Sequence, residues 1–177
     1  ATDGAITVWN VENAEAAASE PIEGTVEQPA SVVVLSVDGK RLATTGVSSD
    51  RPAIIVFDLE ANKLSHTLLG HERPIRSLAF SPDGLRLVSG SADKSARVWD
   101  LGDSKFPELI RFNGHAAEVT AVAFNSTAAQ VISGSADKTL KLWNTADAVE
   151  IKAFTGHAGA IVGVAFNSAS QPVSASA

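Results

Sequence analysis

The 177-residue chain has no cysteine. This excludes disulfide bonds and thiolate chemistry but leaves the cellular compartment open. No apolar run approaches the 18 residues of a membrane-spanning helix, so we expect no membrane partner. The N-terminus, ATDGAITVWN, lacks the basic stretch and apolar core of a signal peptide, and the missing initial methionine suggests a processed or trimmed piece. A net charge of −6 disfavours a nucleic-acid partner, whose binding relies on Lys and Arg.

What the chain does contain is a repeated pattern. Gly-His pairs stand at 70–71, 114–115 and 156–157, which puts the histidines 44 and 42 residues apart. Four aromatic residues, each followed by Asp or Asn, interleave with these pairs: Trp9, Phe57, Trp99 and Trp143. Residues 70–100 and 114–144 align without a gap and share the run SGSADK, and residues 156–177 begin a third copy. A fixed period of this length indicates a repeat architecture.

Each copy contains short alternating runs that are divided by turn residues, a pattern typical of β-strands. In one copy the pattern predicts strands at residues 75–80, 86–91, 96–99 and 109–112. Pro82 and Gly84 predict a turn between the first two, because proline fixes φ and glycine accepts a positive φ. Four antiparallel strands per repeat form one propeller blade. Blades must then stack around an axis, since a single blade leaves its faces exposed.

The repeat resembles the WD-repeat (WD40) family over most of the chain, and two copies are close to that family's pattern. The resemblance implies an all-β fold, a WD40-type β-propeller with four repeats' worth of four-stranded antiparallel blades. Three of these blades are whole and two are complementary half-blades. We therefore expect one propeller unit or half-propeller, residues 1–177, with blade parts and blades at these positions: 1–26, about 31–69, 75–112, 118–154, and 160–177.

The resemblance also implies a role for the recurring polar residues, which form a buried hydrogen-bond chain in each blade of that family. Carried over, one chain is His71, Ser91, Asp93 and Trp99, and the next is His115, Ser135, Asp137 and Trp143. Ser89 and Ser133 lie two residues earlier on the same strand face and are the alternatives for the serine position. Ser, His and Asp are also the residues of a hydrolase triad. Because these residues recur at the repeat period, we favour a structural role for them and expect no catalytic residue.

We expect no metal site and no cofactor. The three Gly-His histidines would lie in different blades, too far apart to share an ion, and no cysteine assists them. Residues 38–39 and 83–84, both Asp-Gly, predict turns rather than calcium loops, because no further acidic ligands follow at the required spacing. No phosphate-binding glycine loop is present in the sequence.

The first whole blade departs from the pattern. Residues 31–58 keep the strand rhythm, but Phe57 replaces tryptophan and no Gly-His pair precedes them. Residues 50–52 are expected to lengthen the second turn, and apolar packing is expected to hold the blade together. The acidic stretch at residues 11–30 is interpreted as a solvated connector, extended or with a short helix at 12–19. A charged docking segment is the alternative.

The two ends of the sequence are complementary. Residues 5–10, AITVWN, match a third strand, a fourth fits within residues 20–26, and residues 160–177 provide only a first and a second strand. Bare strand edges favour the addition of a strand from another chain. Two copies could therefore form a homodimer, an eight-bladed ring in which each shared blade takes two strands from each chain. The alternative is that this sequence is half of a longer chain.

The fold does not name the function. The resemblance implies a non-enzymatic scaffold for a protein or peptide partner of unknown identity, bound on the face that the Gly-His and second-turn loops form. Candidate contacts are the charged residues in or beside these loops: Glu72, Arg73, Arg76, Lys94, Glu118 and Lys138. One alternative is a purely architectural or oligomerising segment of a larger bacterial protein. An enzyme with its site on the propeller face is ranked last.

Overall fold

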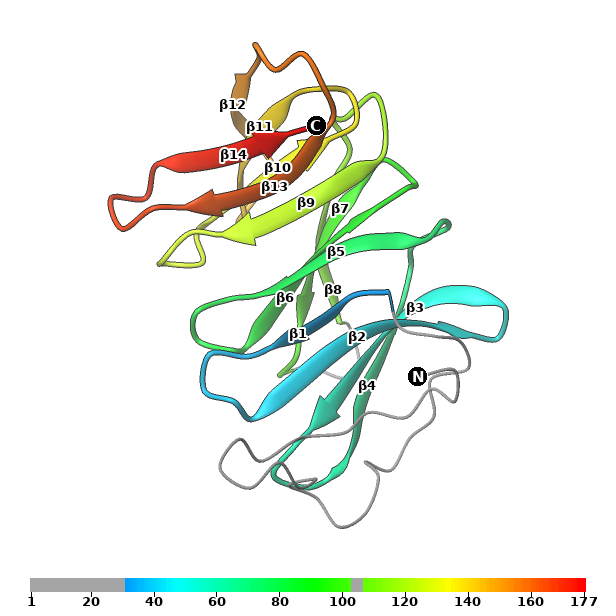
Figure 1. The fold of residues 1–177 in the computed structure, drawn as a ribbon. Coiled ribbons are helices and arrows are strands. Elements are labelled where there is room, and N and C mark those ends of the chain that lie inside the picture. Colours follow the sequence, from blue (N-terminus) through cyan, green and yellow to red (C-terminus); the bar gives the residue numbers. More distant parts are fainter. Residues whose placement is uncertain (1–30, 103–106) are drawn as a thin grey trace, which may run out of the picture.

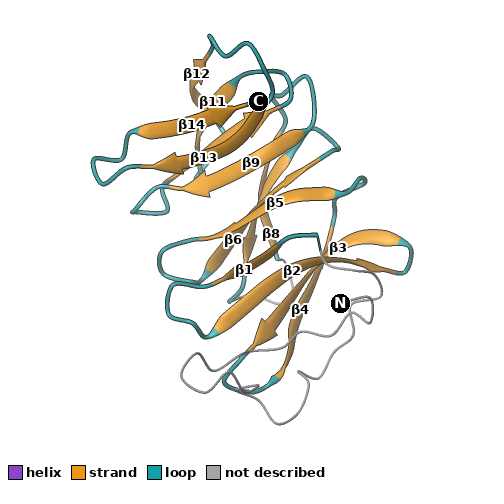
Figure 2. Cartoon of the chain, viewed as in Figure 1, coloured by secondary structure: helices purple, strands orange, loops and turns teal. Residues whose placement is uncertain are grey.

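The chain folds into antiparallel β-sheets that follow one another like the blades of a propeller (Figures 1 and 2). The computed structural model describes residues 31–102 and 107–177. In this part of the chain every regular element is a strand, and there is no helix that could span a membrane. The expected blade part at residues 1–26 and the expected helix at 12–19 lie outside the described residues.

Three sheets have four strands each and the last has two. The first sheet consists of β1 (Val33–Leu35), β2 (Arg41–Ser48), β3 (Arg51–Asp58) and β4 (Lys63–Leu69). The second consists of β5 (Ile75–Phe80), β6 (Arg86–Ser91), β7 (Ala96–Asp100) and β8 (Glu108–Phe112). The third consists of β9 (Val119–Phe124), β10 (Gln130–Ser135), β11 (Leu140–Asn144) and β12 (Glu150–Phe154). The two-stranded sheet consists of β13 (Ile161–Phe166) and β14 (Pro172–Ser176). The predicted all-β propeller with whole blades and a C-terminal half-blade is confirmed.

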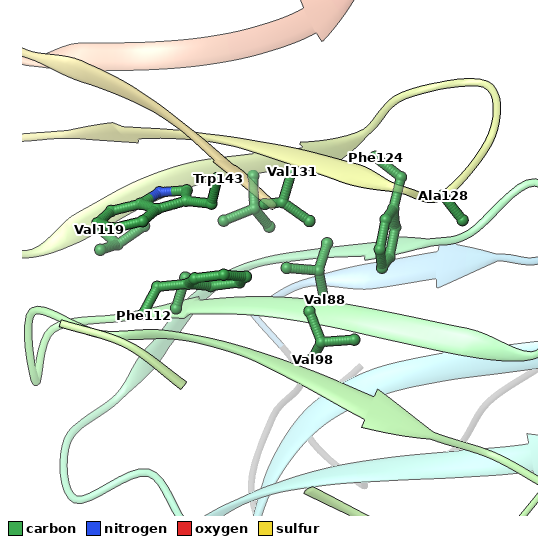
Figure 3. Close-up of a cluster of buried hydrophobic side chains, with 10 residues drawn as sticks. Val88, Val98, Phe112, Val119, Phe124, Ala128, Val131 and Trp143 are labelled. Atoms are coloured by element: carbon green, nitrogen blue, oxygen red, sulfur yellow. The ribbon is translucent and has the colours of Figure 1, made fainter. Parts of the chain in front are cut away.

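The sheets stack face to face, with their first strands on the side of the propeller axis. Strand β9 lies against both β5 and β13, the first strands of the neighbouring sheets. Apolar side chains fill the spaces between sheets because the alternation along each strand sends every second side chain to the same face. Figure 3 shows the layer between the second and third sheets, where Val88 and Val98 face Val131 and Trp143. Burial of such layers provides the main stabilising free energy of the fold.

The tight turns follow from their residues. Gly84 has a φ of 69°, in the left-handed region that glycine adopts without strain, and its amide donates to the Ser81 carbonyl over 2.9 Å. The expected long turn in the first blade is wrong. Ser49 and Asp50 alone make that turn, with φ of 51° and 61°, and Arg51 and Pro52 belong to β3. Two central residues with positive φ match a two-residue hairpin turn, so the extra residues lengthen the strands instead.

The first blade is packed on both faces by apolar side chains. Phe57 occupies the position of the tryptophan and is fully buried, in a cluster with Leu42, Ala53 and Ile55. The opposite face of the blade meets the second sheet in an apolar cluster that includes Ile54 and Trp99. Phenylalanine has no side-chain hydrogen-bond donor, so Phe57 cannot make the buried hydrogen bond that a tryptophan indole makes.

Candidate functional site in two buried hydrogen-bond chains

The first chain of side-chain hydrogen bonds joins three parts of the second blade. His71 lies in the connection after β4 and is 1% exposed. Its Nδ1 lies 2.7 Å from Oδ2 of Asp93, in the β6–β7 turn, and its Nε2 lies 2.7 Å from Oγ of Ser89 on β6. The indole Nε1 of Trp99 on β7 donates to the same Ser89 oxygen over 2.9 Å. The chain therefore ties the connection, the turn and two strands together.

The third blade repeats this arrangement at equivalent positions. His115 Nδ1 lies 2.9 Å from Asp137 Oδ2, and its Nε2 lies 2.8 Å from Ser133 Oγ. The Trp143 indole donates to Ser133 over 2.7 Å. In both blades the histidine packs edge-on against the tryptophan, with ring centroids 6.0 and 6.3 Å apart. Two blades with the same buried contacts indicate one structural unit used twice.

The serine positions correct the sequence expectation. Ser89 and Ser133 join the histidine to the tryptophan, and Ser91 and Ser135 do not. Strand β6 places Leu87 opposite Trp99, so the indole reaches the next residue on that face, Ser89. Ser91 lies two residues further toward the turn, where its Oγ accepts from the Asp93 amide and donates to the Arg73 carbonyl over 2.9 Å.

Sequence reasoning also missed a hydroxyl that holds each aspartate. Ser95 Oγ donates to Asp93 Oδ1 over 2.6 Å, and Thr139 Oγ1 donates to Asp137 Oδ1 over 2.6 Å. These residues stand two positions after the aspartate in both copies, as Asp-Lys-Ser and Asp-Lys-Thr. That recurrence is the signal that could have identified them. These two hydroxyl groups orient each carboxylate toward its histidine ring.

The electrostatics favour ionisation of the aspartate in both hydrogen-bond chains. Burial alone would raise the pKa of Asp93, but hydrogen bonds from His71 and Ser95 outweigh burial and hold this pKa well below its usual range. Burial also opposes ionisation of Asp137, yet hydrogen bonds from Thr139, the Ala116 amide and His115 lower its pKa to about 2. Burial lowers the pKa of His115, which favours its neutral imidazole. This ring then donates from Nδ1 to the Asp137 carboxylate and accepts the Ser133 hydroxyl proton at Nε2.

The glycine of each Gly-His pair makes room for the tryptophan. A Cβ on Gly114 would overlap the six-membered ring of Trp143. A Cβ on Gly70 would lie 3.1 Å from the Trp99 ring and 2.6 Å from a guanidinium nitrogen of Arg97, which pairs with Glu108. Any larger residue would push the indole away from its serine. The Gly-His pair is therefore one steric and hydrogen-bonding element.

The arrangement of Asp, His and Ser is that of a hydrolase triad, but its surroundings do not suit catalysis. Ser89 and Ser133 have no exposed surface, so a substrate cannot approach either hydroxyl oxygen. The tryptophan N–H also occupies the oxygen that a nucleophile would use. Among the residues that the structure describes, no three His, Asp or Glu side chains are grouped to hold a metal ion.

The six charged residues expected to contact a partner lie at one end of the blades. Antiparallel pairing brings the start of β5 beside the end of β6, so the Gly-His loops and the second turns share this edge. Five of the six are exposed and Glu118 is partly covered. Arg76 Nε donates to Glu118 Oε2 over 3.0 Å, which links the second and third blades. The structure thus places these residues on one face.

A family model described as "WD domain, G-beta repeat" matches residues 62–100 and 106–144. These two ranges contain both hydrogen-bond chains. The chain thus contains repeats of the WD40 family.

Relatives of this WD40 chain share its repeats over part of their length. It is 48% identical over 63 residues to WD repeat and SOCS box-containing protein 1 of Xenopus tropicalis, covering 35% of this chain and 14% of the relative. It is 32% identical over 102 residues to WD repeat-containing protein SL1-17 of Schistosoma mansoni, covering 58% and 32%. It is 32% identical over 100 residues to human WD repeat-containing protein 36, covering 56% and 10%. The chain therefore spans a third or less of these relatives.

A solved structure shows the same fold over nearly the whole chain. A chain in the crystal structure of a Mitotic Checkpoint Complex superposes with a TM-score of 0.77 at 23% identity. The superposition covers 93% of this WD40 chain and 50% of the other chain. The WD40 chain therefore has the shape of about half of that longer chain.

Proposed function

We propose that this WD40 chain is a non-enzymatic platform that binds a protein or peptide partner on the face of the Gly-His loops and second turns. WD-repeat proteins generally act as scaffolds for protein interactions. One observation supports the proposal above others: the polar groups with potential chemistry are buried in structural chains, and charged side chains around them face solvent. A purely architectural segment would need no such charged face.

Lys94 and Lys138 are the most informative members of this face. They occupy equivalent positions in the second turns of two neighbouring blades, both with φ near 70°. Both are exposed, and neither contributes to the core. A side chain at the tip of a tight turn, with no structural contact to keep, is well placed to meet a partner.

The experiment compares partner capture by the chain with capture by the double variant Lys94→Glu and Lys138→Glu. The substituted residues keep their Cβ atoms, so the strain of the positive φ is unchanged. The matched control is Lys40→Glu with Lys63→Glu, which alters net charge equally at the opposite end of the blades. The platform proposal expects partners, identified by mass spectrometry, to be lost from the first variant and kept by the control. Equal capture by both variants would refute this face as the binding surface.

For the assembly, we propose that two copies form an eight-bladed ring as a homodimer. The support is the edge of β14, which pairs with β13 alone among the described strands. Exposed strand edges add strands readily, and exchange of identical elements is a low-cost route to a symmetric dimer.

A further inference from the structure

The connection into the third blade contains the pair Asn113-Gly114, directly before His115. It follows the outer strand β8 of the second blade, and both residues of the pair are exposed. At the two other Gly-His pairs the residue before the glycine is Leu69 or Thr155. Of the three Gly-His connections, that of the third blade alone has a side-chain amide next to its glycine.

An asparagine followed by glycine can react within the chain. The backbone nitrogen of the glycine attacks the asparagine Cγ, its proton passes to the side-chain nitrogen, and ammonia leaves as a succinimide ring closes. Water then opens this ring at either carbonyl carbon, breaking one C–N bond and forming a carboxylic acid. Opening at one carbon gives aspartate. Opening at the other gives isoaspartate, in which the main chain runs through the former side-chain carbonyl.

The local structure leaves the attacking nitrogen of Gly114 accessible. Strand β8 ends at Phe112, which pairs with Ala96, so the ladder of the second blade does not include the Asn113-Gly114 pair. The Gly114 amide donates to no acceptor among the described residues. Glycine also has no Cβ to hinder the approach of its nitrogen to the neighbouring carboxamide, and its backbone adopts many conformations.

The other described asparagines are less suited to this reaction. Asn125, Asn144 and Asn167 each use Oδ1 to accept a main-chain amide hydrogen within their own turn. Such bonds fix the carboxamide in one orientation. The residue that follows is serine or threonine for these three and lysine for Asn62, so a Cβ stands beside the nitrogen that would attack. Asn113 is therefore the reactive asparagine among the described residues.

The isoaspartate product would disturb a tightly packed part of the blade. Gly114 lies against the Trp143 ring, and a Cβ there would stand 2.3 Å from a ring carbon. The next residue, His115, bonds to Ser133 over 2.8 Å. Isoaspartate lengthens the main chain by one carbon, about 1.5 Å, so Gly114 and His115 cannot both keep these contacts. Aspartate keeps the length of the main chain and leaves both contacts in place.

We propose that Asn113-Gly114 is a site of spontaneous covalent modification, at which isoaspartate forms and loosens the third blade. The reaction also creates a substrate for a second one. The free carboxylate of isoaspartate is the former main-chain carboxyl group of residue 113, at an exposed position. Methyltransferases that recognise isoaspartate transfer a methyl group from S-adenosylmethionine to this carboxylate and release S-adenosylhomocysteine. The aged chain is thus a methyl acceptor, whereas the freshly made chain is not.

Ageing of the folded, full-length chain tests the site. The protein is incubated in mildly alkaline buffer, and isoaspartate is counted by methylation with labelled S-adenosylmethionine and an isoaspartate methyltransferase. Peptide fragmentation in the mass spectrometer then locates the change from amide to acid. Conversion at Asn113 should exceed that at Asn62, Asn125, Asn144 and Asn167 at least tenfold, and the label should lie on residue 113. Conversion at Asn113 no faster than at Asn125 would overturn the proposal.

Two variants separate the chemistry from its effect on the fold. Asn113→Thr copies the residue before Gly156 and removes the amide, and Asn113→Gln keeps an amide on a side chain one carbon longer. Both should lose at least nine-tenths of the label. Equal labelling of Asn113→Gln and the wild type would refute the site. Ageing should lower the melting temperature of the wild type and leave that of Asn113→Gln unchanged. Full labelling at residue 113 with an unaltered wild-type melting temperature would refute the loosening of the blade.

Discussion

The Trp143 indole donates a 2.7 Å hydrogen bond to Ser133 Oγ, and this bond spans two neighbouring strands of the third blade. The same oxygen serves His115, so one buried hydroxyl holds a tryptophan and a histidine in place. Removing this hydroxyl lowers stability because the indole N–H and the imidazole nitrogen would stay buried without a hydrogen-bond partner.

Ser133→Ala should lower the free energy of unfolding by about 1–3 kcal/mol, because the indole N–H and one imidazole nitrogen lose their partner in the core. Trp99→Phe and Asp137→Ala should cost about the same for the same reason. Urea unfolding measures these differences. Ser168→Ala, at an exposed position, is the control and should leave stability nearly unchanged. If Ser133→Ala were as stable as that control, the structural role of the buried hydrogen bonds would be wrong.

Gly114→Ala should destabilise the fold by about 1–3 kcal/mol, since the added methyl group overlaps the Trp143 ring in a packed core. Thermal unfolding reports the change. Gly163→Ala is the matched control, because a Cβ there meets no described atom within 4 Å. Equal melting temperatures for the two variants would argue against the steric role of the Gly-His pair.

Acid should destabilise the protein in two stages. Burial lowers the pKa of His115 below 6.5, although Asp137 opposes this, so the unfolded state binds protons first. The free energy of unfolding should therefore fall as the pH drops below about 6.5. The pKa of Asp137, lowered from 3.8 to about 2, adds a second loss as the pH falls from 3.8 toward 2. The difference between the wild-type curve and that of His115→Gln isolates the first stage, and a flat difference curve would contradict it.

The Arg76–Glu118 pair should contribute little to stability despite its 3.0 Å geometry. Its side chains are 51% and 38% exposed, and such pairs are typically worth about 0.2–1 kcal/mol and are screened by salt. A double-mutant cycle with Arg76→Ala and Glu118→Ala measures the coupling. A coupling above about 2 kcal/mol that persists at 1 M salt would show that the pair is a structural link rather than part of an accessible face.

The purified chain should show no ester or peptide hydrolysis that depends on Ser89 or Ser133, because both hydroxyl oxygens are buried and accept a tryptophan N–H. The check is turnover of an activated ester by the wild type and by the two alanine variants. Turnover that disappears in a variant still folded by circular dichroism would establish an enzyme.

The sequence predicts the fold well because the repeat is close to regular. The Gly-His pairs and the SGSADK run predict the strands from Ile75 to Phe112 almost to the residue, since turn residues and alternation are local signals. Local sequence does not decide whether Ser89 or Ser91 bonds to the tryptophan. Both face the same way on β6, and only the register with β7 decides which one meets Trp99. The two-residue turn at Ser49 and Asp50 was missed because neither residue is a glycine, so their positive φ values leave no mark in the sequence.

The cavity beside Ser174 shows what the structure adds. The sequence does not reveal that the third sheet and the β13–β14 hairpin supply the walls of one cavity. Those walls depend on side chains from two blades, Phe154 from one and Ser174 from the other, which come together only through blade packing.

The native mass of the 177-residue chain tests the account most directly. Light scattering at micromolar concentration should give twice the chain mass of 18.3 kDa. A stable 18.3 kDa species for the wild type, with the residues of β14 protected from hydrogen exchange, would contradict the two-copy propeller.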